Sequence, residues 1–117
     1  MKKYITITGI NHYYGHSAFK KGMKVKLVKE PDNKHDKEAI KVQTKSLDKV
    51  GYVANSSHTV LGNCMSAGRI YDKIGDITNA KVTDILPQGI VCKIKNKKDK
   101  KTISTENTTN TIDELKT

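Results

Sequence analysis

The sequence is poor in the residues that build metal centres, disulfide frameworks and membrane spans. It contains only two cysteines, Cys64 and Cys92, which lie far apart in apolar surroundings and form no C-x-x-C pair. Such cysteines are typical of buried, reduced thiols. No apolar run is long enough to cross a bilayer, and no signal-peptide pattern is present. These absences predict a cytoplasmic protein with no metal or other cofactor and no membrane association.

Motifs of the common catalytic classes are also missing. No glycine pattern of a phosphate-binding loop occurs, which argues against nucleotide hydrolysis. Ser17, His35 and Asp36 are residue types found in hydrolases, but nothing around them resembles a nucleophile elbow or an activated serine. His12 and His16 have metal-ligand spacing only on a helix, and the glycine between them disfavours one. We therefore expect a binding protein rather than an enzyme.

Arginine is almost absent, although the chain is strongly basic. The 117 residues carry a formal net charge of +10, and Arg69 is the only arginine among 22 basic residues. Lysine ammonium groups suit phosphates, but they lack the planar fork with which arginine reads base edges. The composition favours a polyanionic partner held through its backbone, and it does not separate DNA, RNA and anionic lipid.

Length and composition limit the chain to one small domain with a modest core. Hydrophobic residues make up 35% of the sequence and charged residues 29%. From residue 96 onward the chain is rich in Lys, Thr and Asn without periodicity, which predicts a mobile tail over 96–117. The folded domain is expected over 1–95. The lysine run at 95–101 is either a solvated extension or a source of non-specific phosphate contact.

Alternating hydrophobic residues predict a series of short strands. In the second strand Val25 and Leu27 share one face, and Lys24 and Lys26 lie on the wet face. Short strands with one inserted helix predict a mainly β fold with one or two short helices, a small, partly open OB-like β-barrel. The expected strands are 4–8, 23–30, 40–43, 50–54, 80–86 and 89–94.

The expected connections include one helix and two turns. Asn55–Ser57 is expected to cap a helix that runs to about Ala67 and stops at Gly68. Its apolar residues recur at helical spacing. A turn is expected over 72–79, and a hairpin turn across Leu86–Gly89.

The most informative segment is 30–42, which reads EPDNKHDKEAIKV. A strand stops at a proline, a polar loop carries a His-Asp pair, and a second strand follows. Eight residues later comes VGYV at 50–53, and glycines occur upstream at 9 and 15. This order resembles the HIRAN domain family over about residues 5–82. The resemblance implies a modified OB-type barrel and a non-catalytic nucleic-acid-binding module.

The resemblance also implies a ligand. In the family members fused to fork-remodelling helicases, the domain holds the 3′-hydroxyl end of single-stranded DNA, and a Tyr-Asp pair receives the terminal nucleotide. In this sequence His35 and Asp36 take those positions. Asp36 would accept a hydrogen bond from the terminal hydroxyl and repel a terminal phosphate. His35 can still stack on a base, with less area than a phenol and with a charge that titrates.

Further base contacts are implied upstream and downstream of this pair. His12 and Tyr13 fall in the family's aromatic cluster, where stacked bases contribute about 1–3 kcal/mol each. Tyr13 and Tyr14 are adjacent and point to opposite sides of an extended chain, so we expect one in the core and Tyr13 exposed. Tyr52 stands where the family has a stacking histidine, and it could equally be part of the barrel wall.

Phosphate contacts differ from those of the family. Asn11 and Asn55 stand where the fork-remodelling proteins have an arginine and a lysine, so two phosphate contacts are weakened. The amide hydrogens of a helix beginning at Ser57 would compensate in part. The candidate nucleic-acid-binding residues are therefore His12, Tyr13, Lys24, Lys26, His35, Asp36, Tyr52, Asn55 and Ser57.

Other interpretations stay open at this stage. Asp32, Asn33 and Asp36 are also typical of a polar turn that bonds its own backbone. The module could bind a protein partner, such as a DNA-repair or phage-defence component, with 103–117 as its docking segment. It could also bind RNA, because the charge argument applies equally there. We expect a monomer whose main partner is single-stranded DNA.

Overall fold

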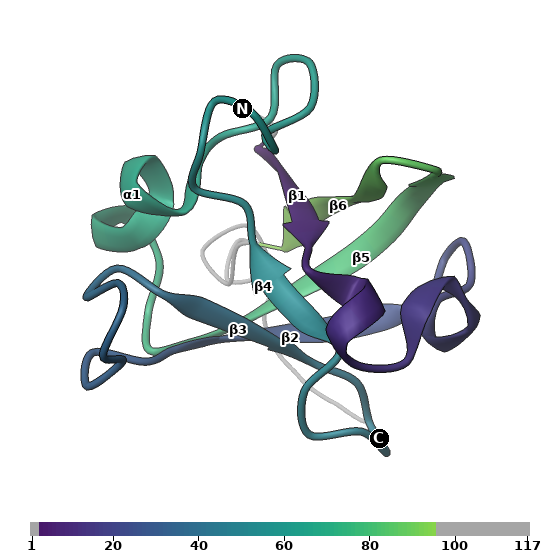
Figure 1. Ribbon diagram of the computed structural model, residues 1–117, viewed down its shortest axis with the longest axis horizontal. Helices are drawn as coiled ribbons and strands as arrows, with labels where there is room; N and C mark the ends of the chain where they lie inside the picture. The colour runs from purple at the N-terminus through teal and green to yellow at the C-terminus, as the bar shows by residue number, and fades with distance from the viewer. Residues whose placement is uncertain (1–2, 96–117) are drawn as a thin grey trace, which may run out of the picture.

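Residues 3–95 are described by a computed structural model, in which six antiparallel strands close into one ring (Figure 1). Neighbours around the ring follow the order β1-β4-β3-β2-β5-β6. The strands are β1 (Tyr4–Thr8), β2 (Lys24–Lys29), β3 (Ile40–Gln43), β4 (Gly51–Val53), β5 (Ile77–Leu86) and β6 (Gly89–Lys95). The helices are α1 (Ala67–Ile70) and three 3-10 turns, η1 (Ile10–His12), η2 (Gly15–Ala18) and η3 (Tyr71–Lys73).

The core forms inside the ring because inward-facing positions alternate with outward-facing ones along each strand. Leu27, Val42 and Ile90 are fully buried, and each comes from a different strand. Cys92 is also fully buried, while Cys64 is half-buried, and both thiols are free. Burial raises the pKa of the Cys92 thiol to about 12. The predicted mainly β, small OB-like barrel is confirmed, but the ring is closed and not partly open as predicted, because β1 pairs with both β4 and β6.

The helix predicted to begin at Ser57 and reach Ala67 is wrong. The only α-helix among residues 3–95 begins at Ala67, where that prediction ended, and the Ser66 hydroxyl caps it by accepting a hydrogen bond from the Arg69 amide at 3.3 Å. Ser57 lies in an exposed loop. The anion site expected from helical amides at this residue is therefore also wrong.

The loop before α1 stays non-helical because it is bonded along β1. The Leu61 amide donates to the Thr6 hydroxyl at 3.1 Å, and the Met65 amide donates to the Tyr4 carbonyl at 2.8 Å. Between them Gly62 has φ +52°, a left-handed conformation that interrupts helical backbone. The apolar side chains of this loop recur at helical spacing, and that spacing led to the wrong prediction of a helix.

The β5–β6 hairpin confirms the turn predicted across Leu86–Gly89. Strand β5 begins at Ile77, inside the segment expected to be a turn, because its first residues pair with β2. It also holds one extra residue. Val82 faces Cys92 and Asp84 faces Val91, so Thr83 is a β-bulge. The Thr83 hydroxyl donates to the Val91 carbonyl at 3.2 Å. The tail predicted over 96–117 and the lysines at 97–101 lie outside the described residues.

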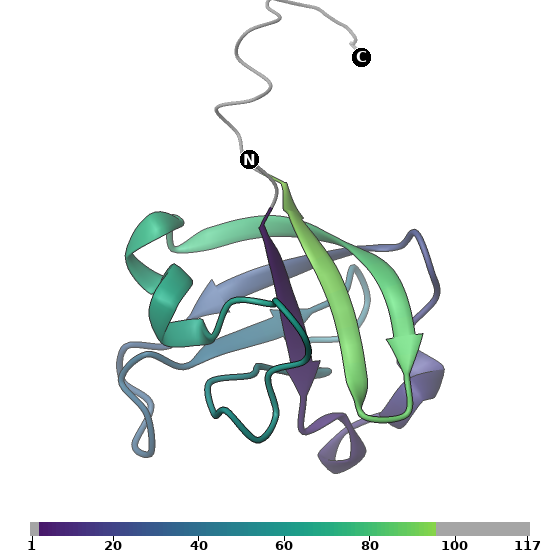
Figure 2. The same cartoon turned by 90° about the horizontal axis from the view of Figure 1, so that it is seen from above.

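Strand β1 closes the ring by pairing with β4 on one side and β6 on the other (Figures 1 and 2). Glycines flank it on both sides. A Cβ atom added at Gly51 would lie 2.7 Å from Ile7 Cγ2 and 2.8 Å from the Thr8 carbonyl oxygen. One added at Gly89 would lie 2.9 Å from the Ile7 carbonyl oxygen. Both closures therefore need a residue without a side chain.

Gly51→Ala should lower the free energy of unfolding by roughly 1–3 kcal/mol, because the new methyl group collides with β1 backbone that cannot move aside. Gly75→Ala is the matched control, since the nearest atom to its added Cβ is 4.0 Å away. We expect the control to stay within about 0.5 kcal/mol of the wild type in urea unfolding. Equal unfolding midpoints for the two variants would contradict this account of ring closure.

Candidate nucleic-acid interface

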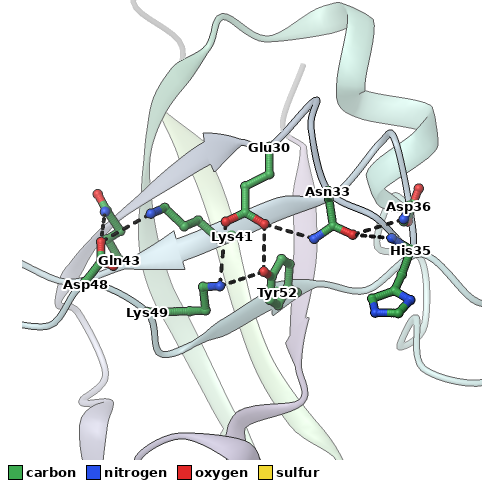
Figure 3. A network of polar contacts seen from close by, with 9 residues as sticks. All are labelled: Glu30, Asn33, His35, Asp36, Lys41, Gln43, Asp48, Lys49 and Tyr52. Atoms are coloured by element: carbon green, nitrogen blue, oxygen red, sulfur yellow. Dashed lines mark hydrogen bonds and ion pairs between the residues drawn. The ribbon is translucent and has the colours of Figure 1, made fainter.

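The loop between β2 and β3 is folded around the side chain of Asn33. Its Oδ1 atom accepts hydrogen bonds from the amides of His35 at 2.8 Å and Asp36 at 3.0 Å (Figure 3). Its Nδ2 atom donates to Glu30 Oε1 at 3.1 Å. A short amide side chain replaces a backbone partner in this way in many turns. The interpretation of Asn33 as a turn residue is confirmed, and the turn fixes where His35 and Asp36 lie.

The Asp36 carboxylate is half-buried and bonded through both oxygens. Oδ1 accepts from the Glu38 amide at 2.9 Å, and Oδ2 accepts from Asn55 Nδ2 at 3.0 Å. Asn55 in turn accepts from the Gly68 amide at 2.8 Å. Gly68 is close enough that an added Cβ would lie 2.7 Å from Glu38 Oε1. Asn55 therefore ties the loop to α1.

Tyr52 is held between a carboxylate and an ammonium group. Its hydroxyl donates to Glu30 Oε1 at 2.6 Å and accepts from Lys49 Nζ at 2.8 Å. Lys49 also forms an ion pair with Glu30 Oε2 at 3.6 Å. Figure 3 shows the three groups meeting below the end of β2. Tyr52 thus joins β4 to the start of the β2–β3 loop.

This contact changes the acidity of all three groups. Burial alone would raise the pKa of Glu30, but hydrogen bonds from Tyr52 and Asn33 and the charge of Lys49 bring that pKa below its ordinary value. Burial and the hydrogen bond to Glu30 raise the pKa of Tyr52. The hydrogen bond to Tyr52 raises the pKa of Lys49. Around neutral pH these shifts favour a carboxylate, a phenol and an ammonium group.

Tyr13, at the end of η1, also lies near the Lys49 ammonium group. Lys49 Nζ lies 6.0 Å from the centre of the Tyr13 ring and 5.0 Å from that of Tyr52. The expectation that one of two adjacent tyrosines would be in the core is wrong: 40% of Tyr13 and 53% of Tyr14 is exposed. The reason is that this segment folds into 3-10 turns, so the rule for extended chain does not apply.

These contacts connect into one continuous path, which we call the polar line. It brings together four of the predicted residues and does not include the other five. His12 and His35 are exposed beside it, on η1 and in the loop. Ser57 lies beyond Asn55, and Lys24 and Lys26 lie at the opposite end of β2. The members of the polar line are Tyr13, Lys49, Tyr52, Glu30, Asn33, Asp36 and Asn55.

Sequence reasoning did not name three members of the line as binding residues: Asn33, which was predicted only as a turn residue, Lys49 and Glu30. Lys49 was not predicted because it lies in the turn before β4, where strand alternation gives no orientation. Glu30 belongs to the segment that carries the family resemblance, but its role as the shared acceptor depends on pairing between β2, β3 and β4. The sequence signal for this contact was weak, namely a carboxylate just after β2 and a tyrosine in β4.

Clusters of metal ligands and membrane-spanning helices are absent from the residues that the structure describes. In the part of the chain between residues 3 and 95, no three His, Cys, Asp or Glu side chains come together in a way that could hold a metal ion. The helices described there are also too short to cross a membrane. His16, one of the two histidines with possible metal spacing, lies within 2.9 Å of the Leu86 carbonyl oxygen through Nε2.

A small closed barrel, with aromatic rings and a lysine grouped on one flank, is an OB-like binding domain. The sequence profile of the HIRAN domain matches residues 3–85, and the chain belongs to the HIRAN domain family. Members of this family are nucleic-acid-binding modules and are generally non-catalytic.

A solved structure supports the fold independently. The crystal structure of a protein from Lactobacillus plantarum, a structural-genomics target, is similar with a TM-score of 0.51 at 19% sequence identity. The similarity covers 82% of this chain and 98% of the other. No curated protein matches the sequence significantly. At this identity the likeness concerns architecture alone.

The lowered pKa of Glu30 predicts acid-sensitive stability. The unfolded chain binds a proton to Glu30 near its ordinary value of 4.5, whereas the folded chain binds it only at lower pH. Stability from this group is therefore present above that value and lost as the pH falls. The melting temperature of the wild type should fall more steeply than that of Glu30→Gln between about pH 5 and pH 3.

Asp48 does not disturb this comparison. Hydrogen bonds from Lys41 and Gln43 lower its pKa too, but this contribution is the same in both proteins. Thermal melts followed by circular dichroism would measure the two slopes. Parallel slopes would show that Glu30 gains nothing from Tyr52 and Lys49.

Proposed function

We propose that this protein is a non-catalytic module that binds single-stranded DNA and prefers a free 3′-hydroxyl end. Membership of the HIRAN family supports nucleic acid as the ligand class. The observation that carries the proposal is the polar line, in which Tyr13 and Tyr52 flank Lys49 and hydrogen bonds continue to Asp36. Along this path come aromatic rings that can stack on bases, an ammonium group that can bind a phosphate, and a carboxylate that can accept a hydrogen bond from the terminal hydroxyl.

The first part of the proposed contact is stacking. Tyr13 is 40% exposed at the end of η1, so a base can cover its ring. The ammonium group of Lys49 lies between Tyr13 and Tyr52, where it can meet a phosphate that follows a stacked base. His12 and His35 are exposed near the two ends of the line and offer further π faces.

The second part concerns the strand end. Each Asp36 oxygen accepts one protein hydrogen bond, and a carboxylate oxygen has about two acceptor positions. One position on each oxygen is therefore left for a hydroxyl donor. A terminal phosphate carries negative charge and donates poorly, so it is repelled by the same carboxylate. The contacts to Asn55 and Glu38 hold the acceptor in place before the ligand arrives.

The thiols and the closed ring support a compartment and an oligomeric state for the protein. Two free thiols, one of them fully buried, support a reducing compartment such as the cytoplasm. Strand closure leaves no unpaired sheet edge in the described ring, which supports a monomer.

The end preference is tested with two oligonucleotides that differ only in a 3′-hydroxyl or a 3′-phosphate. Fluorescence anisotropy should give tighter binding of the hydroxyl form by about tenfold or more, the value of one hydrogen bond to a charged group. Asp36→Asn should remove that ratio. Asp32→Asn makes the same charge change in the same exposed loop and should keep it.

Each result of this panel has a meaning. Equal affinity of the wild type for both ends would refute the end preference. Equal or tighter binding of an RNA strand of the same sequence would favour the RNA-binding alternative. If no oligonucleotide bound at low salt, while a protein partner survived nuclease treatment in a pull-down, the module would be a protein-interaction domain.

The stacking contact is tested by truncating the two neighbouring tyrosines separately. Tyr13→Ala should weaken binding of either oligonucleotide by roughly tenfold, since one stacked base contributes about 1–3 kcal/mol. Tyr14→Ala should change affinity less than twofold, because of these two neighbouring rings only Tyr13 has a described contact with Lys49. Both variants remove an exposed ring, and Tyr14 is the more exposed of the two, so equal losses would place the stacking site elsewhere.

A further inference from the structure

A row of lysines crosses three strands on the outside of the barrel. Lys24 of β2 pairs with Lys81 of β5, and Lys81 pairs with Lys93 of β6. Neighbouring strands lie about 4.8 Å apart, so the row places three side chains across roughly 10 Å. Their strand neighbours Val25, Val82, Cys92 and Ile94 are buried, and the lysines therefore point outward.

A second row runs beside the first. Lys26 pairs with Asn79, and Asn79 pairs with Lys95. It lies two residues further along β2, on the same face of the sheet. We call the two rows together the lysine face. It consists of Lys24, Lys26, Lys81, Lys93 and Lys95.

The charges of the lysine face are not balanced by the part of the chain that the structure describes. The ion pairs there join Lys41 to Asp48 and Lys49 to Glu30. Neither includes a lysine of the face, and none of these five ammonium groups donates a described hydrogen bond. Like charges directly opposite each other destabilise a sheet. An external polyanion would relieve that repulsion.

The face continues into a hollow. Lys24 and Lys26 form part of the wall of a groove of about 480 Å³, together with Asn79 and the 43–48 segment. Lys45 adds a further positive charge. Asp48 is the one acidic lining residue, and its Oδ1 already accepts from Lys41 and Gln43. The lining thus includes three lysines, two amides and two hydroxyl side chains, which suit phosphate and sugar oxygens.

We propose that the lysine face and its groove form a second nucleic-acid-binding surface, which holds the sugar-phosphate backbone without reading bases. This inference rests on the proposed function, because it assigns a second contact to the same ligand. Lysines on strands offer point charges and no forked donors, so the contact is independent of sequence. Among the described residues, no aromatic ring lies between the lysines of the face, although Tyr4 of β1 pairs with Lys93 at the end of the first row.

The five lysines of the face and the polar line lie on different parts of the ring, and the groove approaches the polar line where Asp48 of its lining precedes Lys49. The polar line uses β4 and the end of β2, whereas the lysine face uses the start of β2 with β5 and β6. Lys24 and Glu30 are six residues apart, a distance of about 20 Å along an extended strand. A short oligonucleotide can therefore occupy the polar line alone. A longer one, beyond the roughly 4–16 nucleotides that one OB fold covers, can reach both.

The test compares two charge-matched triple variants by anisotropy with a strand of about 30 nucleotides. Lys24→Gln, Lys81→Gln and Lys93→Gln together should lower the slope of log affinity against log salt by about 2, or roughly 0.7 for each lost phosphate contact. The wild type should then lose about twentyfold more affinity than the variant between about 50 and 200 mM salt. The 3′-hydroxyl to 3′-phosphate ratio should not change.

The control is Lys20→Gln, Lys21→Gln and Lys73→Gln, which removes three exposed charges from the turn between η2 and β2 and from η3. Its slope should stay near that of the wild type. Without ligand, the lysine-face variant should melt at the same or a higher temperature, because opposed charges have been removed. This melt also shows that the variant is folded.

The outcomes separate the two proposals. Wild-type binding that depends on salt, with equal slopes for both triple variants, would overturn the lysine face and leave the proposed function standing. A wild type that binds no oligonucleotide would overturn both. A face variant that loses the preference between ends, with its salt slope unchanged, would also overturn the separation of the two surfaces.

Discussion

Closure of the barrel through β1 is the constraint on which the other features depend. This strand of five residues is bonded on both edges, and its Ile7 lies between two glycines that allow the neighbouring backbones to approach. The same strand receives the loop before α1 through Thr6 and Tyr4. If β1 were displaced, β4 would lose its position, and with it Tyr52 and the turn that carries Lys49.

The polar line shows how a small domain can fix the position of a surface with few side chains. Glu30 is the shared acceptor of Tyr52, Asn33 and Lys49, so one carboxylate connects a strand, a loop and a turn. Asn55 does the same between the loop and α1. Because both are partly or fully accessible to water, each single bond is modest, and the arrangement depends on their connection.

Much of the fold could be predicted from the sequence because outward and inward residues alternate cleanly. The segments around Leu27, Val42 and Ile90 were assigned as strands on that pattern, and the ends of β1 and of the hairpin followed from turn residues. The false helix arose because loop residues that pack on a strand can also recur at helical spacing. Nothing in the local pattern showed that Leu61 and Met65 would bond to β1.

The candidate site was predictable only in part, for a related reason. The His35–Asp36 loop is local, and its turn chemistry can be read from Asn33 alone. The partnership of Asp36 with Asn55 and of Tyr52 with Glu30 joins residues about twenty positions apart. Such contacts depend on register between strands, and a single sequence records register only weakly.

The β-bulge at Thr83 determines which side chains of β5 and β6 lie opposite each other on the outside of the barrel. If Thr83 paired regularly with Cys92 instead of bulging, Val82 would lie opposite Lys93, and an apolar side chain would share a row with an ammonium group. The electrostatic character of this flank therefore depends on Thr83 staying unpaired as well as on the lysines themselves. Regular pairing of Thr83 would rearrange the charge pattern while every basic residue remained in the chain, whereas deleting Thr83 would keep Val82 opposite Cys92 and Lys81 opposite Lys93.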